Sequence, residues 1–334
     1  MTKSVKIGMM SFAHIHAEAY IENIRAIPGV TLSGIVDLDA ERAETFGNLY
    51  QTPVTDDFER FFAQKPDGVV ICSENNAHLS MVERAIEAGV RHICCEKPLA
   101  TTLADAQRIV ALAAANRVNL MTAFPMRFSE PVIEVKRTLD SGAAGKIYCF
   151  SSSNEGRMPS LYRKWFVDLV LAGGGALQDH LVHLTDLFRW ITGSEVASVY
   201  AQSRQAFHPG EVEVETAGMA MLKFRNGVFA SIDSSWSRPD YYPTWGGLDF
   251  EVVTERGALQ VDAFRQKLTV FSHDVQGQRW VDWGSDSNQA MINEFIASIR
   301  EERPAAVSGE DGLRAVEVVH AAYESAASGQ VVTL

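Results

Sequence analysis

A histidine and two aspartates recur at helical spacing near the middle of the chain. Asp179, His183 and Asp186 stand four and seven residues apart, which aligns them along one face of an α-helix. Histidine titrates near neutral pH and can accept and return a proton, and a carboxylate beside it can bind a hydroxyl group or pass the proton on. The spacing therefore suits acid–base chemistry on a hydroxyl group, although by spacing alone a solvated helix face is the more ordinary explanation.

A lysine stands directly after a strand-like apolar run. Lys97 follows His92–Cys95 and precedes Pro98, and a proline favours an extended backbone at the residue before it. Past the carboxyl end of a parallel strand, a cation meets a ligand rather than the core. The ammonium group could there bind an oxygen that gains negative charge during a reaction; the alternative is a surface lysine.

The first apolar strand runs into a segment that departs from the glycine-rich dinucleotide fingerprint. That fingerprint places glycine at positions 11, 13 and 16, where this chain has Ser11, Ala13 and His16. A helix start still follows the strand, and its N–H groups and positive dipole end favour phosphate. We therefore predict dinucleotide contacts from Ser11, Phe12, Ala13, His14 and Ile15; the alternative is that His14 and His16 only begin a helix.

An aspartate at the end of the second strand bears on the kind of dinucleotide. Asp37 comes about 20 residues after the turn, where a carboxylate accepts hydrogen bonds from the adenosine ribose. Its charge would repel the 2′-phosphate of NADP, so we predict NAD, while Arg42 nearby keeps NADP as the alternative. By itself, Asp37 is also explained as a turn residue.

The elements that position these residues follow from the periodicity of apolar residues. In the first third of the chain, short apolar runs alternate with helix-period stretches. The predicted strands are Val5–Met10, Thr31–Val36, Gly68–Cys72, His92–Cys95 and Asn119–Ala123, and the predicted helices are Ile15–Ile27, Ala40–Asn48, His78–Ala88 and Leu103–Ala115. Doubly apolar strands joined by helical crossovers predict an α/β domain with a Rossmann-type, doubly wound parallel sheet.

The pattern changes near Phe124, where strand runs begin to dominate. The predicted strands are Ile147–Ser153, Val196–Gln202, Glu213–Phe224, Val228–Trp236, Leu248–Thr254, Ala258–Ala263 and Leu268–Ser272, and the predicted helices are Pro131–Leu139, Gly175–Trp190, Asn288–Arg300 and Asp311–Ala327. This predicts an α+β domain with an open, mostly antiparallel sheet. We expect a dinucleotide-binding domain over 1–123 and a substrate-binding and oligomerisation domain over 124–334, with the C-terminal helices as candidates for packing back on the first domain.

Composition and charge narrow the classes of function. The 334 residues carry a formal net charge of −12, with 46% hydrophobic and 22% charged residues, as in globular proteins. Such an acidic chain repels nucleic acid and anionic membranes, and no apolar run reaches the length of about 18 residues that spans a bilayer. Four cysteines without a C-x-x-C pair, and an N-terminus without a signal peptide, predict a cytoplasmic protein.

Four motifs occur in an order that resembles one protein family. They are Ser73–His78, which is similar to a T-P-N-x-x-H loop, then Glu96–Pro98, then Gly173–Asp186 with the pattern G-G-G-x-x-x-D-x-x-x-H, and the final helix between Gly309 and Gly329. Together they resemble the glucose–fructose oxidoreductase, inositol dehydrogenase and rhizopine-catabolism family (Gfo/Idh/MocA) over nearly the whole chain. Glu74, Met126 and Leu181 depart from the family's usual proline, asparagine and glycine.

The resemblance implies hydride transfer between NAD and a carbinol carbon of a sugar, cyclitol or related polyol. It implies three catalytic residues, with Lys97 binding the reacting oxygen, His183 acting as general base for oxidation, and Asp179 binding a substrate hydroxyl or joining the proton relay. It implies further cofactor contacts from Ser73, Asn75, His78, Glu96, Lys97 and Arg127. It also suggests a cis peptide bond before Pro98.

Substrate selection is expected from loops, because loops on a rigid scaffold usually carry such contacts. The segment Asn154–Trp165 combines arginines with aromatic residues. The candidates are Arg157, Tyr162, Trp165, His180 and Trp236, and each is also explained as an ordinary loop or packing residue. Asp179, His180 and His183 lack the additional ligands of a dedicated zinc set, so no metal site is predicted.

Two other functions remain open on the same scaffold. Some relatives keep NAD bound and use transient oxidation to cleave a glycosidic bond or eliminate a group, and the altered glycine turn would also suit a non-catalytic dinucleotide-binding regulator. In either case an exposed apolar sheet face is commonly buried in an oligomer. We therefore expect a homodimer or homotetramer through the C-terminal sheet.

Overall fold

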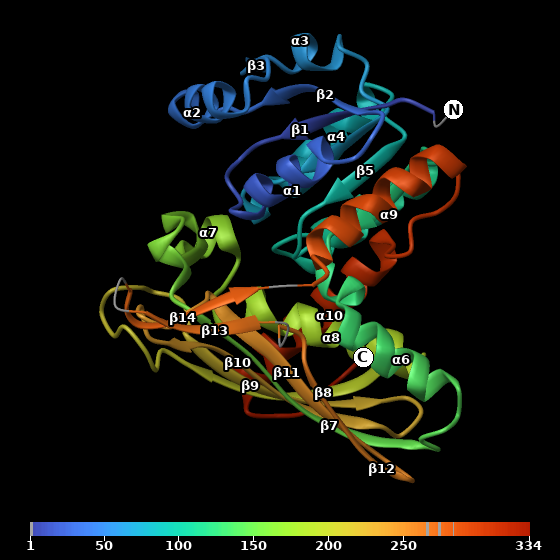
Figure 1. Ribbon diagram of the computed structural model, residues 1–334. Coiled ribbons are helices and arrows are strands. Elements are labelled where there is room, and N and C mark those ends of the chain that lie inside the picture. Colours follow the sequence, from blue (N-terminus) through green and yellow to red (C-terminus); the bar gives the residue numbers. More distant parts are fainter. Residues whose placement is uncertain (1–2, 265–266, 273–274, 283) are drawn as a thin grey trace. The chain divides into compact units, whose positions relative to one another are not determined.

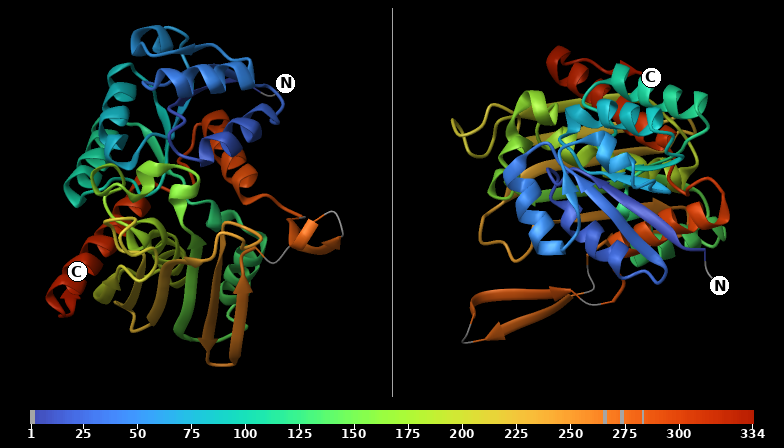
Figure 2. Two further views of the ribbon diagram at one scale, coloured as in Figure 1. Left: turned by 90° about the vertical axis from the view of Figure 1, so that its left-hand side faces the viewer. Right: turned by 90° about the horizontal axis from the view of Figure 1, so that it is seen from above.

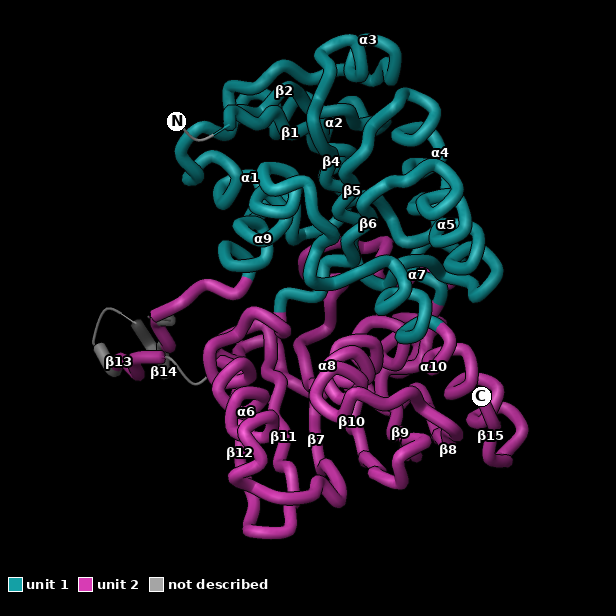
Figure 3. Tube along the Cα trace, turned by 90° about the vertical axis from the view of Figure 1, so that its right-hand side faces the viewer, with its two compact units in different colours: residues 1–125, 170–173, 288–316 teal, residues 126–169, 174–287, 317–334 magenta. Residues whose placement is uncertain are grey.

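The computed structural model describes residues 3–264, 267–272, 275–282 and 284–334. The chain folds into two compact units (Figure 3). Unit 1 comprises residues 1–125, 170–173 and 288–316, and unit 2 comprises residues 126–169, 174–287 and 317–334. Within the described part of the chain, no helix is long and apolar enough to cross a membrane.

Unit 1 is built around a six-stranded parallel sheet with the strand order β3-β2-β1-β4-β5-β6 (Figures 1 and 2). The strands are β1 Val5–Met10, β2 Val30–Val36, β3 Val54–Thr55, β4 Gly68–Ile71, β5 His92–Cys95 and β6 Asn119–Thr122. The helices are α1 His16–Arg25, α2 Ala40–Tyr50, α3 Phe58–Phe62, α4 His78–Glu87, α5 Leu103–Ala115, α7 Leu169–Ala172 and α9 Ser287–Glu301, with a 3₁₀ turn at Asn75–Ala77. The strand order reverses between β1 and β4, and ligands of such sheets bind at this reversal.

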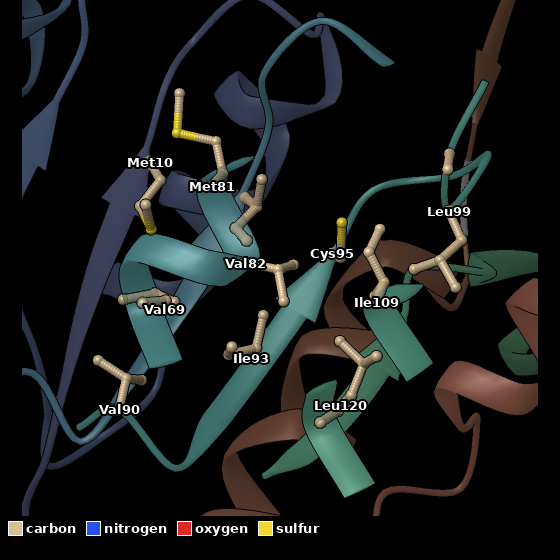
Figure 4. Packing of buried hydrophobic residues seen from close by; sticks show 14 of the residues in the cluster. Met10, Val69, Met81, Val82, Val90, Ile93, Cys95, Leu99, Ile109 and Leu120 are labelled. Atoms are coloured by element: carbon tan, nitrogen blue, oxygen red, sulfur yellow. The ribbon is translucent and has the colours of Figure 1, made fainter. Parts of the chain in front are cut away.

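The core of unit 1 explains why its strands are apolar throughout. Val69 of β4 and Ile93 of β5 are completely buried and pack with Val82 of α4 and Ile109 of α5 (Figure 4). A parallel sheet that is covered by helices on both faces requires this double burial. The predicted doubly wound fold is therefore confirmed.

Two short elements between β2 and β4 escaped the prediction. Strand β3 has two residues and helix α3 has five, which is too short for either to show a period in the sequence. Helix α3 is stabilised at its start, where the Asp57 carboxylate accepts hydrogen bonds from Glu59 N and Arg60 N. Both elements lie in the segment that connects β2 to β4, which stand on opposite sides of β1 in the sheet.

Unit 2 is built around a seven-stranded sheet with the order β12-β11-β7-β10-β9-β8-β15, in which only the β7–β10 pair is parallel. The strands are β7 Ile147–Arg157, β8 Val196–Arg204, β9 Ala217–Phe224, β10 Phe229–Arg238, β11 Gly246–Thr254, β12 Gly257–Asp262 and β15 Val332–Thr333. The helices are α6 Glu130–Asp140, the π-helix η5 Leu177–Leu181, α8 Val182–Thr192 and the later part of α10 Gly309–Ser328, whose residues up to 316 belong to unit 1, with 3₁₀ turns at Pro125–Phe128, Pro159–Leu161 and Lys164–Val167. Strands β13 Lys267–Ser272 and β14 Val275–Asp282 pair separately (Figure 2).

One face of this open, mostly antiparallel sheet carries the core of unit 2, as predicted. Phe150 of β7 stacks on Phe188 of α8 with ring centroids 4.1 Å apart, and Phe250 of β11 meets Phe188 edge-on at 5.6 Å. Inward side chains alternate with outward ones along each strand, so the opposite face leaves Met219 and Met221 of β9 exposed.

Three predicted boundaries in unit 2 are wrong in ways that concern the site. Strand β7 continues to Arg157 instead of ending at Ser153, so the segment expected as a loop begins inside the sheet. Strand β9 begins at Ala217 rather than Glu213. The predicted helix Gly175–Trp190 opens with the π-helical turn η5 before α8 begins. The 3.6-residue spacing of apolar residues cannot reveal a π-turn, because such a turn adds one residue locally while the helix continues.

Candidate active site

The turn after β1 has the backbone shape of a dinucleotide turn without its first glycine. Ser11 has a φ of 69°, in the left-handed region that usually requires glycine. Its Oγ accepts a hydrogen bond from Ala13 N at 3.1 Å and donates one to Asp37 Oδ2 at 3.3 Å. Local bonds of this kind let short polar side chains adopt the left-handed conformation, so serine here takes the conformation of the missing glycine.

Asp37 binds this turn and Arg42 at the same time. Its Oδ2 accepts hydrogen bonds from Phe12 N at 2.7 Å and Arg42 Nε at 2.8 Å, and its Oδ1 accepts one from Arg42 Nη2 at 2.8 Å. Burial by itself lowers the pKa of Arg42, but hydrogen bonds and charge contact with Asp37 raise it. The predicted ribose-binding carboxylate is thus fully buried and paired, and an adenosine ribose would meet an ion pair there rather than a lone carboxylate.

The other predicted cofactor contacts around the turn differ in what they can offer. The Phe12 ring is buried and stacks on Phe46 at 4.6 Å, which leaves only its backbone to face a ligand. Ile15 is half-buried at the start of α1. Ser73 Oγ donates to Glu74 O at 3.1 Å.

Asn75 presents a polar atom that the described residues leave unsatisfied. Its Nδ2 donates to Ala172 O at 2.9 Å. Its buried Oδ1 has no hydrogen-bond partner within the ranges that the structure describes. Because a buried acceptor without a partner costs free energy, Asn75 is a sound candidate for a ligand contact.

A buried carboxylate links the loops that follow β1 and β5. Glu96 has no exposed surface, and its Oε1 lies 3.0 Å from His16 Nδ1 and 3.9 Å from His14 Nδ1. Its Oε2 accepts a hydrogen bond from Lys97 N at 2.8 Å. Burial by itself raises the pKa of Glu96, but the charges of His14, His16 and Lys97 and the hydrogen bond with His16 hold it well below its usual range. An ionised Glu96 therefore ties the dinucleotide turn to the backbone of Lys97.

Lys97 lies at the carboxyl end of β5 and is only 4% exposed. Its peptide bond to Pro98 is cis, as the family resemblance suggests. His78 Nδ1 lies 3.0 Å from Pro98 O, and burial lowers the pKa of His78, so the neutral ring donates this hydrogen bond. His78, predicted as a cofactor contact, thus supports the Lys97–Pro98 turn.

The residues present in unit 1 fit a dinucleotide. The left-handed turn at Ser11, the start of α1 directly behind it and the carboxylate that follows β2 are the parts that hold pyrophosphate and ribose in doubly wound sheets. All three lie beside β1, at the reversal of strand order. Ser11 and Ala13 keep the side chains of the turn small.

In unit 2, the helix that carries the predicted catalytic pair is held at its start by Glu215. The Glu215 Oε1 atom accepts hydrogen bonds from Gly175 N and Leu177 N at 3.0 Å each and from the Tyr323 hydroxyl at 2.8 Å. A Cβ atom on Gly175 would lie 1.8 Å from Glu215 O, and one on Gly174 would lie 2.0 Å from the Tyr323 hydroxyl oxygen. Close packing against Glu215 and Tyr323 therefore requires both glycines.

The π-helical turn pairs Asp179 with the adjacent histidine. Asp179 Oδ2 lies 3.2 Å from His180 Nε2 and accepts a hydrogen bond from Trp236 Nε1 at 3.3 Å. His180 Nδ1 lies 2.7 Å from Asn154 O, so both ring nitrogens of His180 face acceptors. The Asp179 side chain is 17% exposed and that of His180 is 5% exposed, while His183 is half-buried. Asp179 is therefore oriented by Trp236 and His180, and it keeps an exposed edge.

Asp186 and Arg127 form an ion pair inside unit 2. Arg127 Nε donates to Asp186 Oδ2 at 2.7 Å and Nη2 donates to Oδ1 at 2.5 Å, with both side chains buried. The two parallel bonds have the geometry of the strongest protein ion pairs. The charge of Arg127, predicted to contact the cofactor, is thus committed to Asp186, and Asp186 stabilises the unit.

The substrate candidates differ in exposure. Trp236 and Trp165 are buried, and Trp236 directs its Nε1 group at Asp179. Arg157 and Tyr162 are half-buried and contact each other. The predicted specificity residues therefore include two packing tryptophans and one more accessible arginine–tyrosine pair.

Comparison with known proteins agrees with both units. Residues 5–124 match the family model described as "Oxidoreductase family, NAD-binding Rossmann fold". Residues 132–260 match the model described as "GFO/IDH/MocA C-terminal domain". The first match lies at the N-terminal end of the chain and the second follows it, and residues 261–334 lie outside both.

Curated relatives and solved structures extend over the whole chain. The oxidoreductase YrbE of Bacillus subtilis is 28% identical, covering 100% of this chain and 98% of its own length. The myo-inositol 2-dehydrogenase of Thermotoga maritima is 29% identical, covering 96% of this chain and 94% of its own length. A crystal structure of GenD2 from gentamicin A biosynthesis, in complex with NAD, has a TM-score of 0.90 at 23% identity and covers 100% of this chain and 97% of that one.

Proposed function

Because the chain belongs to the Gfo/Idh/MocA family of NAD-binding oxidoreductases, we propose that it transfers a hydride between NAD and a secondary alcohol or ketone of a sugar, cyclitol or related polyol. The observation that carries this proposal is Lys97. It is a buried cation at the carboxyl end of β5, and the contacts of Glu96 and His78 hold its backbone. In such sheets, the carboxyl ends of the strands are where ligands bind.

Each proposed catalytic residue has a separate task. Bound NAD would supply the hydride acceptor. Lys97 binds the reacting oxygen and stabilises the negative charge that it gains. His183 takes the hydroxyl proton during oxidation and returns it during reduction. Asp179, oriented by Trp236 and His180, binds a hydroxyl group of the same substrate.

We propose that unit 1 binds the cofactor and unit 2 binds the polyol. The turn from Ser11 to Ile15 and the start of α1 receive the pyrophosphate. The Asp37–Arg42 pair receives the adenosine ribose. The Asp37 carboxylate favours NAD, and Arg42 is the group that would accept the 2′-phosphate if NADP bound. A polyol as substrate is supported by the relative named myo-inositol 2-dehydrogenase and by the Asp179 carboxylate and the Arg157 guanidinium group of unit 2, since such groups hydrogen-bond hydroxyl groups well.

A panel of polyols tests the proposal. The purified protein is assayed with inositols, aldoses and anhydro sugars, each with NAD and with NADP, by following the absorbance of the reduced cofactor. We expect at least one polyol to be oxidised, with kcat/KM at least about tenfold higher with NAD than with NADP. A simple secondary alcohol, 2-propanol, serves as the control substrate. The dehydrogenase proposal would be refuted if no polyol produced reduced cofactor and no matching ketone caused reduced cofactor to be oxidised.

The same assay separates the two alternative functions. An enzyme that retains NAD and uses transient oxidation consumes a glycoside or eliminates a group without net NADH. A regulator binds NAD and consumes no substrate. Product analysis together with the NADH signal therefore distinguishes the three functions in one experiment.

We also propose that the protein assembles through the outer face of the large sheet in unit 2. Met219 and Met221 of β9, Tyr200 of β8 and Phe229 of β10 are 60%, 52%, 39% and 48% exposed. Met221 lies directly opposite Tyr200 in the β8–β9 register, so the apolar side chains adjoin across strands. An apolar patch of this kind on a sheet face is typical of an interface between subunits.

Charge on this face should disrupt the assembly. We expect the wild-type protein to be a dimer or tetramer by multi-angle light scattering, and Met221→Glu to shift it to smaller species, because burying an unpaired carboxylate in an apolar interface is costly. Leu49→Glu on α2, at a residue 61% exposed, is the matched control and should leave the mass unchanged. A wild-type monomer at micromolar concentration would contradict the proposed interface.

We further propose that the protein works in the cytoplasm. All four of its cysteines are free thiols, three of them buried. Free cysteines are typical of the reducing cytoplasm, where disulfides are rare.

A further inference from the structure

Two histidines and a glutamate gather where the loops after β1 and β5 meet. His14, His16 and Glu96 each offer one ligand atom, and within the described residues these three atoms all lie within 4.8 Å of one another. The pairwise separations that involve Glu96 Oε1 are 3.0 Å to His16 Nδ1 and 3.9 Å to His14 Nδ1. The two imidazole rings lie with their centroids 4.4 Å apart. Neither histidine is required by the fingerprint, which favours small residues in this turn.

These separations are close to those between the ligands of one metal ion. A divalent transition ion holds imidazole nitrogen and carboxylate oxygen at about 2.0–2.2 Å, so neighbouring ligands of a tetrahedral site lie about 3.4 Å apart. Shifts of about half an ångström would bring the two Glu96 distances to that value. The two histidine ligand atoms lie within 4.8 Å of each other and would approach as the ion binds. Two histidines and a carboxylate suit zinc, cobalt or nickel, whereas magnesium and calcium prefer sites made wholly of oxygen.

The surrounding contacts hold the remote oxygen of Glu96 and indicate which His14 nitrogen would bind the ion. His14 Nδ1 accepts a hydrogen bond from His16 N at 3.2 Å, so this nitrogen carries the lone pair that a metal needs. The other oxygen of Glu96 is held by Lys97 N at 2.8 Å. Hydrogen bonds of this kind to the remote atoms of metal ligands fix their orientation and raise affinity.

Burial differs among the three in a way that leaves one open side. His14 and Glu96 are 1% and 0% exposed at their side chains, while His16 is 31% exposed. An ion could therefore enter past His16 and would be covered on the side of the other two ligands. A fourth position facing solvent would remain for water or another oxygen ligand.

We propose that His14, His16 and Glu96 form a binding site for one divalent transition-metal ion, with Zn²⁺ as the best match. The proposal goes beyond the oxidoreductase function, and its site adjoins the turn Ser11–Ile15 that is proposed above for the pyrophosphate, so metal binding is measured without NAD. In the absence of metal, His16 and Glu96 are joined by their hydrogen bond. Metal binding replaces that bond and the one between His14 and the His16 amide.

Direct titration of the whole protein tests the proposal. Protein stripped with a chelator and dialysed is titrated with ZnCl₂ by calorimetry, and separately with CoCl₂ while the visible spectrum of Co²⁺ is recorded. We expect one equivalent of metal ion to bind per protein chain. The visible spectrum should be that of Co²⁺ with a low coordination number, and it should lack the charge-transfer band that a Cys149 thiolate ligand would add. Thermal unfolding should shift upward with Zn²⁺, because an ion bound to the native state stabilises it.

Three variants decide which residues bind the ion. His16→Ala, at the partly exposed ligand, and Glu96→Gln should each weaken Zn²⁺ binding about 100-fold or more. His92→Ala is the matched control, because His92 begins β5 at the end of that strand opposite Glu96, and it should bind as the wild type does. Circular dichroism confirms that each variant is folded.

Two results would overturn the proposal. Undiminished binding by folded His16→Ala would place the ion elsewhere. No binding by the wild-type protein at 100-fold excess of Zn²⁺ would mean that the three side chains interact only through hydrogen bonds. Neither result affects the polyol assay, which is run with chelator present, so failure of the metal site and failure of the dehydrogenase are separate outcomes.

Discussion

Replacing Lys97 with methionine should lower kcat for polyol oxidation by about 100- to 1,000-fold. Methionine keeps the length and the apolar stem of lysine, so the change removes little more than the charge. Removing one preorganised group that stabilises a developing negative charge typically costs about 3–4 kcal/mol in the transition state. Since Lys97 is 4% exposed, water cannot readily take over its task.

Separate measurements establish that the Lys97→Met effect is catalytic. NAD affinity, measured by quenching of tryptophan fluorescence, should change less than about threefold, because all the cofactor contacts proposed for unit 1 other than Lys97 remain. Lys6→Met, at an exposed lysine of β1 in the same sheet, is the control and should keep wild-type kcat. A Lys97→Met protein that is folded and turns over at the wild-type rate would rule out the proposed role.

Replacing His183 with alanine should lower kcat/KM for oxidation by about 100- to 10,000-fold, the usual contribution of a general base. The loss should fall mainly on kcat, because proton transfer belongs to the transition state rather than to substrate binding. Added imidazole should restore part of the activity of the alanine variant in proportion to its concentration. A purely structural histidine would show no such rescue.

His180→Ala provides the contrast to His183→Ala. His180 contacts Asn154 O and Asp179, so its loss should disorient Asp179 and chiefly raise KM, by about tenfold. Imidazole should rescue it poorly, because the His180 side chain is only 5% exposed and free imidazole reaches the space that it leaves less readily than an open site. If instead His180→Ala abolished turnover and His183→Ala left it intact, the two histidines would exchange roles.

The dinucleotide turn shows how a sequence motif can fail while the geometry behind it remains. The fingerprint predicts glycine at position 11, and Ser11 breaks it. The constraint that glycine satisfies is a positive φ, and Ser11 meets it at 69° with hydrogen bonds to Ala13 and Asp37. Those partners come from the turn itself and from the end of the following strand, so the residue types at the motif positions alone could not show that the turn would form.

The helix that carries Asp179 and His183 shows the opposite case, in which the structure adds contacts that the spacing does not predict. Asp179 and His183 stand four residues apart and would align on an α-helix. The π-turn Leu177–Leu181 adds a residue to the local turn, and Asp179 also lies within 3.2 Å of the adjacent His180. Asp186, third in the predicted stripe, is buried against Arg127. Local spacing could not foresee either pairing, because both depend on packing within unit 2.

Glu215 and Tyr323 were not singled out from the sequence, although they hold the start of the helix that carries Asp179. Glu215 follows a run of polar and β-branched residues that reads as the beginning of β9. Tyr323 lies within a long helix and resembles any half-apolar helical residue. The one local signal was the glycine run before the helix, which indicates that another part of the chain approaches closely.

The sequence by itself determined the two sheets, the family and the residues at the ends of β1, β2 and β5, because strand periodicity and turn residues act over a few neighbouring positions. The tertiary structure decided which of those residues pair. Glu96 meets His16 across 80 residues, Arg127 meets Asp186 across 59, and Glu215 meets Gly175 across 40. Such partners are set by which strand ends and helix starts the topology brings together, and no local preference encodes that.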